Sequence, residues 1–110
     1  MEKWYRKEAD RVMDGRVEYY RHKVGKRPAS FKVKEQKRRW GSCTSRGDIY
    51  FNWRIIMAPP AVVDYLVVHE LCHLIHGNHS GRFWQKVESV LGDYSERRKW
   101  LKKYGIMMDL

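Results

Sequence analysis

The residues with the clearest capacity for chemistry lie between positions 69 and 79. The segment His69-Glu70-Leu71-Cys72-His73 has the pattern HExxH, inside an apolar stretch that favours a helix. Residues four apart lie one above the other on a helix, so His69 and His73 can point at one ion. Four of the five histidines of the chain fall in this short window. We therefore predict a metal site here, with Zn²⁺ as the ion.

A third ligand is required, because a catalytic zinc is held by three protein side chains. His76 lies on nearly the same helical face as His69, but seven residues separate them, about 10.5 Å along the axis of a regular helix. Gly77 predicts a helix end, after which the chain can turn and bring His79 back to the ion. The spacing therefore favours His79 over His76 as the third ligand.

Glu70 is the candidate general base. It lies about 100° around the helix from His69, close enough to reach a water on the ion without binding the ion itself. Bound zinc lowers the pKa of water towards about 7, and a carboxylate can accept the proton and pass it to the leaving group. This pattern predicts a zinc-dependent hydrolase of metallopeptidase type. A structural zinc site is the alternative, but it needs a fourth ligand, and Cys72 points away from the face that carries His73.

The surrounding segments predict a single α+β domain over residues 1–110. Apolar residues recur every three or four positions near both ends and alternate in the middle, and the HExxH segment is apolar on nearly all sides, as in a buried helix. Pro59 and Pro60 mark the start of that helix, where Asp64 suits the positive end of the helix dipole. The predicted elements are a helix over 4–24, strands over 31–35, 40–43 and 49–55 in a small antiparallel sheet, a helix over 61–76, a helix that begins at Asn78 or Ser80, and a helix that begins at Asp93.

Composition limits the partners and the compartment. The chain carries a formal net charge of +10, and residues 1–54 hold 16 Lys/Arg against 7 Asp/Glu while residues 55–110 hold 7 against 6. Clustered cations concentrate anions, so an anionic partner such as nucleic acid or a nucleotide is one interpretation, and a solvated basic surface is the other. Cys43 and Cys72 form no CxxC pair and are predicted to be reduced thiols of a cytoplasmic protein. No stretch predicts a membrane span, and nothing specifies an oligomeric state.

The central segment closely resembles the motif block of the YgjP-like metallopeptidases, which are related to SprT-like and Wss-type proteases. The resemblance rests on RWGSCTSRGDIYFNWRIIMAPPAVVDYLVVHELCHLIHGNHSGRFW and extends from about residue 4 to about residue 104. It implies a minimal zincin fold, with an antiparallel sheet beside the HExxH helix, metal ligands at His69, His73 and His79, and the catalytic acid at Glu70. Members of the family usually carry an additional β-rich segment ahead of the first helix.

Three functions differ in their substrates. A peptidase would pair an extended peptide or protein substrate with the strand at 40–43. A nucleotide phosphohydrolase would hold phosphates with cations on or near the sheet. A nucleic-acid-associated protease would dock through the basic N-terminal half. The cations expected near the sheet are Lys37, Arg38, Arg39, Arg46 and Arg54, and the candidates for stabilising an oxyanion are Tyr65, His76 and Asn78.

Overall fold

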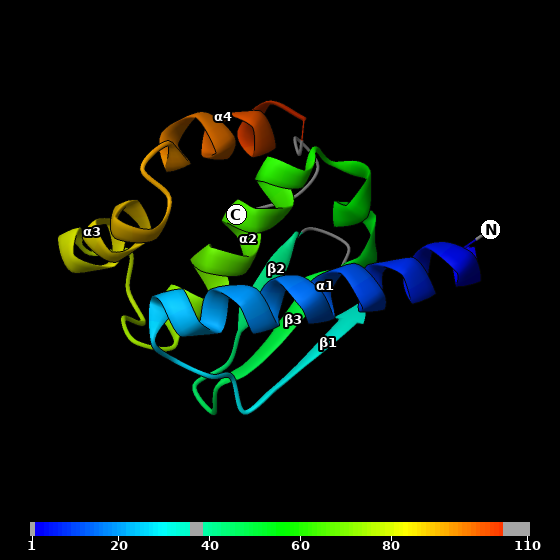
Figure 1. Cartoon of the computed structure of the whole chain (residues 1–110), viewed down its shortest axis with the longest axis horizontal. Helices are drawn as coiled ribbons and strands as arrows, with labels where there is room; N and C mark the ends of the chain where they lie inside the picture. Colours follow the sequence, from blue (N-terminus) through cyan, green and yellow to red (C-terminus); the bar gives the residue numbers. More distant parts are fainter. Residues whose placement is uncertain (1, 36–38, 105–110) are drawn as a thin grey trace.

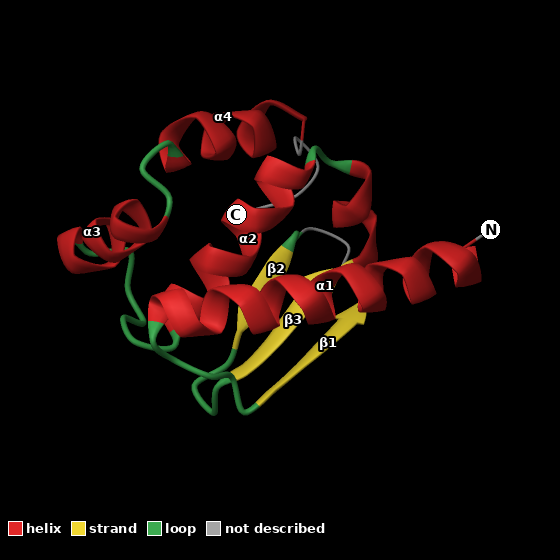
Figure 2. Cartoon of the chain, viewed as in Figure 1, coloured by secondary structure: helices red, strands yellow, loops and turns green. Residues whose placement is uncertain are grey.

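Helices occupy both ends of the chain and a small sheet lies between them. In this computed structural model, which describes residues 2–35 and 39–104, the strands lie beside α1 and α2, and α3 and α4 lie beyond α2 (Figures 1 and 2). The predicted α+β class is confirmed. In chain order the elements are α1 (Glu2–Val24), β1 (Ser30–Lys34), β2 (Gly41–Cys43), β3 (Asp48–Asn52), the 3-10 helix η1 (Trp53–Met57), α2 (Pro60–His73), α3 (Gly81–Val90) and α4 (Tyr94–Tyr104).

The sheet is mixed and not purely antiparallel. The strand order is β1-β3-β2, so β3 is central. β2 pairs antiparallel with β3 across the turn at 44–47, as expected, but β1 pairs parallel with β3, with Phe31 opposite Ile49. The alternation of apolar residues predicts which face of a strand is buried, but not the direction of its neighbour. The antiparallel prediction was therefore wrong for β1.

Helix α2 is the centre of the fold. It contacts α1, α3, α4 and β2, and from Val62 to Cys72 every side chain except that of Asp64 is buried. Packing on all sides explains why the segment is apolar around its whole circumference, as the sequence indicated. The two polar side chains buried within it, His69 and Glu70, are therefore held by dense packing and not by a flexible loop.

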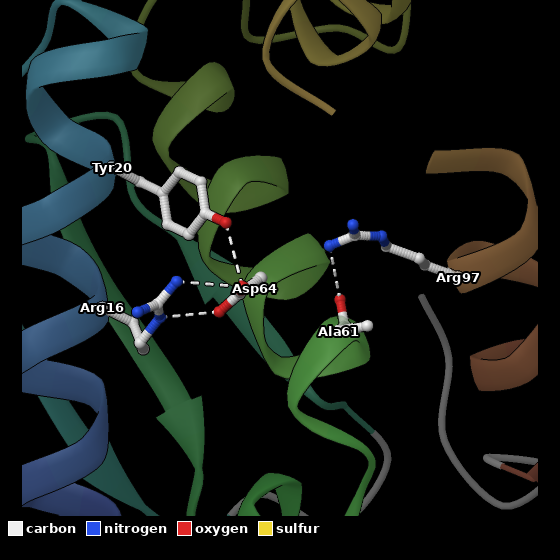
Figure 3. Close-up of polar contacts among 5 residues, drawn as sticks. All are labelled: Arg16, Tyr20, Ala61, Asp64 and Arg97. Carbon is white, nitrogen blue, oxygen red and sulfur yellow. Dashed lines mark hydrogen bonds and ion pairs between the residues drawn. The ribbon is translucent and has the colours of Figure 1, made fainter. Parts of the chain in front are cut away.

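Asp64 joins α1 to α2. Its carboxylate accepts hydrogen bonds from Arg16 Nε at 2.7 Å, Arg16 Nη2 at 2.9 Å and the Tyr20 hydroxyl at 2.9 Å (Figure 3). On the opposite side of α2, Arg97 of α4 donates to the carbonyl of Ala61 at 2.9 Å. The sequence assigned Asp64 to the helix dipole, but its partners are side chains of α1. These contacts fix the start of α2 between two helices.

Some element boundaries differ from the predictions, and for α3 the structure selects one of the two predicted caps. The third strand ends at Asn52, whose side chain accepts the N–H of Arg54 and begins η1, so the predicted strand over 49–55 is too long. Helix α2 ends at His73, ahead of the predicted end at 76, and the next residues continue as a turn. Ser80, and not Asn78, caps α3, because its hydroxyl accepts the N–H of Phe83. In the described part of the chain, no helix has both the length and the apolar character needed to cross a bilayer.

Candidate metal centre

Three histidine rings converge at the end of α2. His69 and His73 lie one turn apart on the helix, and His79 reaches them from the loop that precedes α3. The Nε2 atom of His79 lies 2.8 Å from that of His73 and 3.3 Å from that of His69. Among the described residues these three form the group whose ligand atoms all lie within 4.8 Å of one another. His76, the alternative third ligand, is not part of this group.

The outer nitrogens of two rings have protein partners. Nδ1 of His69 lies 3.1 Å from the Tyr65 hydroxyl, and Nδ1 of His73 lies 3.3 Å from the carbonyl oxygen of His76. A carbonyl can only accept, so the proton of His73 belongs on Nδ1, and its Nε2 presents a lone pair. Such partners are typical of metal-binding histidines, because they fix the tautomer and the ring orientation. Tyr65, a candidate for oxyanion stabilisation, contacts the outer side of His69 and not the shared centre.

Burial favours the neutral form of these rings. It lowers the pKa of His69 to about 3, with smaller contributions from His73 and His79. The pKa values of His73 and His79 are lowered as well, again mainly by desolvation. A histidine must be neutral to bind a metal through Nε2. The packing therefore keeps the three rings in the form that a cation needs.

The donor set fits a zinc ion. Two nitrogens that each lie about 2.0 to 2.1 Å from a tetrahedral zinc are about 3.3 Å apart, close to the separations seen here. Without a cation, hydrogen bonds among the three Nε2 atoms cannot satisfy all of them, because a ring nitrogen that donates a proton cannot also accept one. Three imidazoles with a fourth position left open is the arrangement of a catalytic and not a structural zinc site.

An aromatic wall supports the cluster, and the sequence interpretation missed it. The Phe83 ring lies 5.1, 4.5 and 5.0 Å from the rings of His69, His73 and His79. The Trp84 ring lies 5.6 Å from the ring of His79, and Arg98 of α4 lies 4.8 Å above the Trp84 ring. Phe83 and Trp84 follow His79 closely along the chain, which could have indicated that they lie beside the histidines. Nothing in the sequence links Arg98 to the site.

Glu70 of α2 lies beside the three histidines and faces Gly41, the first residue of β2. Its side chain is 4% exposed, and burial raises its pKa to about 8, while the positive charge of Arg39 opposes the shift. A Cβ placed on Gly41 would lie 3.0 Å from Glu70 Oε2 and 3.3 Å from the backbone oxygen of Tyr50. A side chain at position 41 would therefore require the Glu70 carboxylate or the β3 backbone to shift by a few tenths of an ångström. No sequence pattern connects Gly41 with Glu70.

The histidines and Glu70 open into a cleft of about 870 Å³. One wall is β2 and the turn after it, another is the end of α2, and a third is the loop that follows α1. Four cationic residues line the cleft, and Glu70 is its acidic residue. The lining consists of Lys26, Arg27, Ala29, Arg39, Gly41–Gly47, His69, Glu70, His73, Leu74, Gly77 and His79.

Of the three predicted phosphate-binding cations that the structure describes, two line the cleft and one lies outside it. Arg39 and Arg46 line the cleft, but Arg54 pairs with Glu35, lies against Trp53 and is outside it. Lys37 and Arg38 lie outside the described residues. Asn78, a candidate for oxyanion stabilisation, is exposed and is not part of the cleft lining.

Comparison with known proteins identifies the family. The model of the YgjP-like metallopeptidase domain matches residues 1–104. The fold is similar to that in the crystal structure of the metallopeptidase zymogen of Pyrococcus abyssi abylysin, with a TM-score of 0.76 and 20% sequence identity over 88% of this chain and 99% of that chain. No curated protein matches the chain. The match over nearly the whole chain, together with the clustered histidines beside a buried glutamate, means that the chain belongs to the YgjP-like metallopeptidase family.

Proposed function

We propose that the chain is a zinc-dependent peptidase in which His69, His73 and His79 hold the ion and Glu70 is the general base. The convergence of three Nε2 atoms beside a buried carboxylate, in one cleft, is the observation that carries this proposal. A metallopeptidase family and fold support peptide hydrolysis over other reactions. Zinc is the ion that best suits three imidazole ligands with an open position.

The edge of β2 is suited to hold an extended polypeptide. Asn52 N–H donates to the Trp40 carbonyl and Thr44 N–H donates to the Asp48 carbonyl, so residues 40, 42 and 44 turn their backbone groups towards β3. In an antiparallel ladder the residues between them turn theirs the other way. The N–H and C=O groups of Gly41 and Cys43 therefore point to the outer edge of the sheet, along the cleft. A peptide added there would lie next to Glu70.

Glu70 is suited to move the proton of the reaction. A bound zinc would supply a Lewis acid, which lowers the pKa of water and polarises a carbonyl group. Glu70 accepts the proton of the attacking water and returns it to the leaving amine, so no covalent intermediate with the enzyme is formed. Burial raises the pKa of Glu70, which favours the protonated form that must exist between these two steps. Tyr65 and the His76 carbonyl hold the two helical histidines in place.

Metal content tests the ligand assignment. Purified wild-type protein is compared with His79→Ala and His76→Ala by elemental analysis. One zinc per chain should be found in the wild type, lost with His79→Ala, and kept with His76→Ala, because His76 is outside the histidine group and contacts His73 through its backbone carbonyl. Loss of zinc with His76→Ala and retention with His79→Ala would refute the assignment.

Cleavage tests the reaction. The zinc-loaded protein should cleave an unfolded protein such as denatured casein, and Glu70→Gln should keep its zinc while the rate falls by about 10² to 10⁴-fold. Full activity of Glu70→Gln would show that another group is the base. Release of phosphate from nucleotides, measured in parallel with wild type and Arg39→Ala, should be absent. Release that depends on Arg39, with no cleavage of protein, would favour the phosphohydrolase instead.

A further inference from the structure

Positive charge collects at one end of the cleft. Lys26 and Arg27 come from the loop after α1, and Arg46 comes from the turn after β2; we call these three residues the basic end. All three are exposed, and among the described residues none of them forms an ion pair. The arginines with acidic partners in the rest of the described chain lie outside the cleft. The basic end therefore keeps its charge available to a ligand.

Backbone contacts hold the two segments of the basic end together. The N–H of Ala29 donates to the carbonyl of Gly47 at 2.9 Å, and the N–H of Gly47 donates to the carbonyl of Thr44 at 3.0 Å. Gly47 has a φ of 88°, a conformation that side chains disfavour, and its Cα faces Ala29 and Leu74. Figure 1 shows the loop after α1 beside the turn between β2 and β3. The three cations thus occupy a defined place in the fold.

The direction of β2 determines which part of a peptide meets the basic end. β2 runs from Gly41, next to Glu70, to Cys43 and on to Arg46. An antiparallel peptide runs the opposite way, so residues that precede the cleaved bond lie towards Cys43 and the turn. At about 3.3 Å per residue, the basic end corresponds to about two to four positions before that bond. Arg39 lies beyond the other end of β2 and is not part of this set.

We propose that a substrate peptide adds antiparallel to β2 and that the basic end selects acidic segments, with Asp or Glu about two to four positions before the cleaved bond. This proposal rests on the proposed peptidase function. A peptide is favoured over nucleic acid because the basic end continues the strand edge, where the backbone groups of Gly41 and Cys43 are arranged to pair with another backbone. A phosphodiester chain offers acceptors to the cations but no pattern that matches this edge.

Mapping of cleavage sites tests the proposal. Zinc-loaded wild-type protein is incubated with peptides prepared from a denatured proteome, and mass spectrometry locates the cleaved bonds. Asp and Glu should be enriched about two to four positions before those bonds. The variant Lys26→Gln/Arg27→Gln/Arg46→Gln should lose this enrichment and cleave acidic peptides roughly tenfold more slowly, as expected of three partly exposed ion pairs. Its rate on neutral peptides should fall less than its rate on acidic peptides, so the ratio of the two rates is the readout.

A matched variant controls for net charge. Lys99→Gln/Lys102→Gln/Lys103→Gln removes the same charge from exposed positions on α4, away from the cleft. It should keep the wild-type preference. If both triple variants lose the preference equally, overall charge and not the basic end selects the substrate, and the proposal is overturned.

Binding without turnover separates this proposal from the proposed function. A fluorescent acidic peptide is titrated against Glu70→Gln and against the same variant with the basic end neutralised, by fluorescence anisotropy. Affinity should fall roughly tenfold with the neutral basic end, while the Asn/Gln version of the peptide should bind both proteins equally. Equal affinity of the acidic peptide for both would overturn the proposal.

These experiments distinguish failure of the proposed acidic specificity from failure of the proposed peptidase function. Cleavage of peptides without any acidic preference would leave the peptidase function in place and overturn the role of the basic end. Binding of the acidic peptide through the basic end, with no cleavage of any peptide, would refute the peptidase function and retain the acidic specificity of the cleft. A single-stranded oligonucleotide that binds more tightly than the peptide, through the same three residues, would replace the acidic peptide with nucleic acid.

Discussion

The substitution Glu70→Gln should change how the stability of the metal-free protein depends on pH. Glu70 is 4% exposed, and burial raises its pKa from an ordinary 4.5 to about 8. Gln keeps the shape of the side chain, so the contact with Gly41 is retained while the ionisable group is removed. Any difference between wild type and variant that grows with pH therefore reports on the ionisation of this carboxyl group.

The sign follows from the protons bound in each state. Between pH 4.5 and 8 the folded wild type holds a proton on Glu70 that the unfolded chain has released, so the free energy of unfolding falls as pH rises through this window. Each pH unit corresponds to about 1.4 kcal/mol, so the cumulative loss reaches at most about 3 kcal/mol at pH 7. The variant has no ionisable group at position 70 and does not lose this stability. Its free energy of unfolding should match that of the wild type near pH 5 and exceed it by pH 7.

Ionisation of His69 makes the free energy of unfolding depend on pH in the opposite direction, in both proteins. Its folded pKa is lowered to about 3, so stability falls as pH drops from 6.5 towards 3, because the unfolded chain then binds a proton that the folded protein does not. This contribution is common to wild type and variant, and it cancels in their difference. The difference in stability therefore isolates Glu70, provided that both proteins are measured without metal.

Urea denaturation at several pH values between 5 and 8, in the presence of a chelator, measures the effect. Glu88→Gln is the matched control, because Glu88 is an exposed carboxylate on α3. Its curve should run parallel to that of the wild type. A zinc ion favours the ionised carboxylate, so adding zinc should reduce the advantage of Glu70→Gln. A constant difference between Glu70→Gln and wild type from pH 5 to 8 would refute the reasoning, since it would mean that Glu70 ionises normally in the folded protein.

Two further substitutions test the residues that support the site. Gly41→Ala places a Cβ 3.0 Å from Glu70 Oε2, so zinc should still bind while kcat falls at least about tenfold. The control is Gly15→Ala, whose Cβ meets nothing within 4 Å; it should leave kcat unchanged and stabilise α1 by about 0.5 to 1 kcal/mol. Tyr65→Phe removes the hydroxyl that contacts His69 Nδ1. Zinc affinity, measured by chelator competition, should fall about 10 to 100-fold with the fold retained. An unchanged affinity would exclude a role for this contact.

The location of the site was predictable because most of it is local in sequence. His69 and His73 are brought together by helical spacing alone, and His79 needs only the turn that follows α2. The buried character of α2 was also readable, since its apolar residues cover the whole circumference. The parallel pairing of β1 was not readable, because it depends on which edge of β3 the strand joins and not on the residues of β1.

The candidate chemistry could be read from local features: the residue types at 69, 70, 73 and 79, their spacing, and the apolar helix that carries two of the proposed ligands. The surroundings of these residues depend on the folded chain. Gly41 approaches Glu70 across 29 positions of sequence, and the loop after α1 meets the turn before β3 through Ala29 and Gly47. Helical spacing acts over a few residues, whereas such contacts arise only when burial of the whole core brings distant segments together. The candidate metal-binding pattern is therefore readable from residue types and spacing, whereas the shape and charge of the cleft are properties of the folded chain.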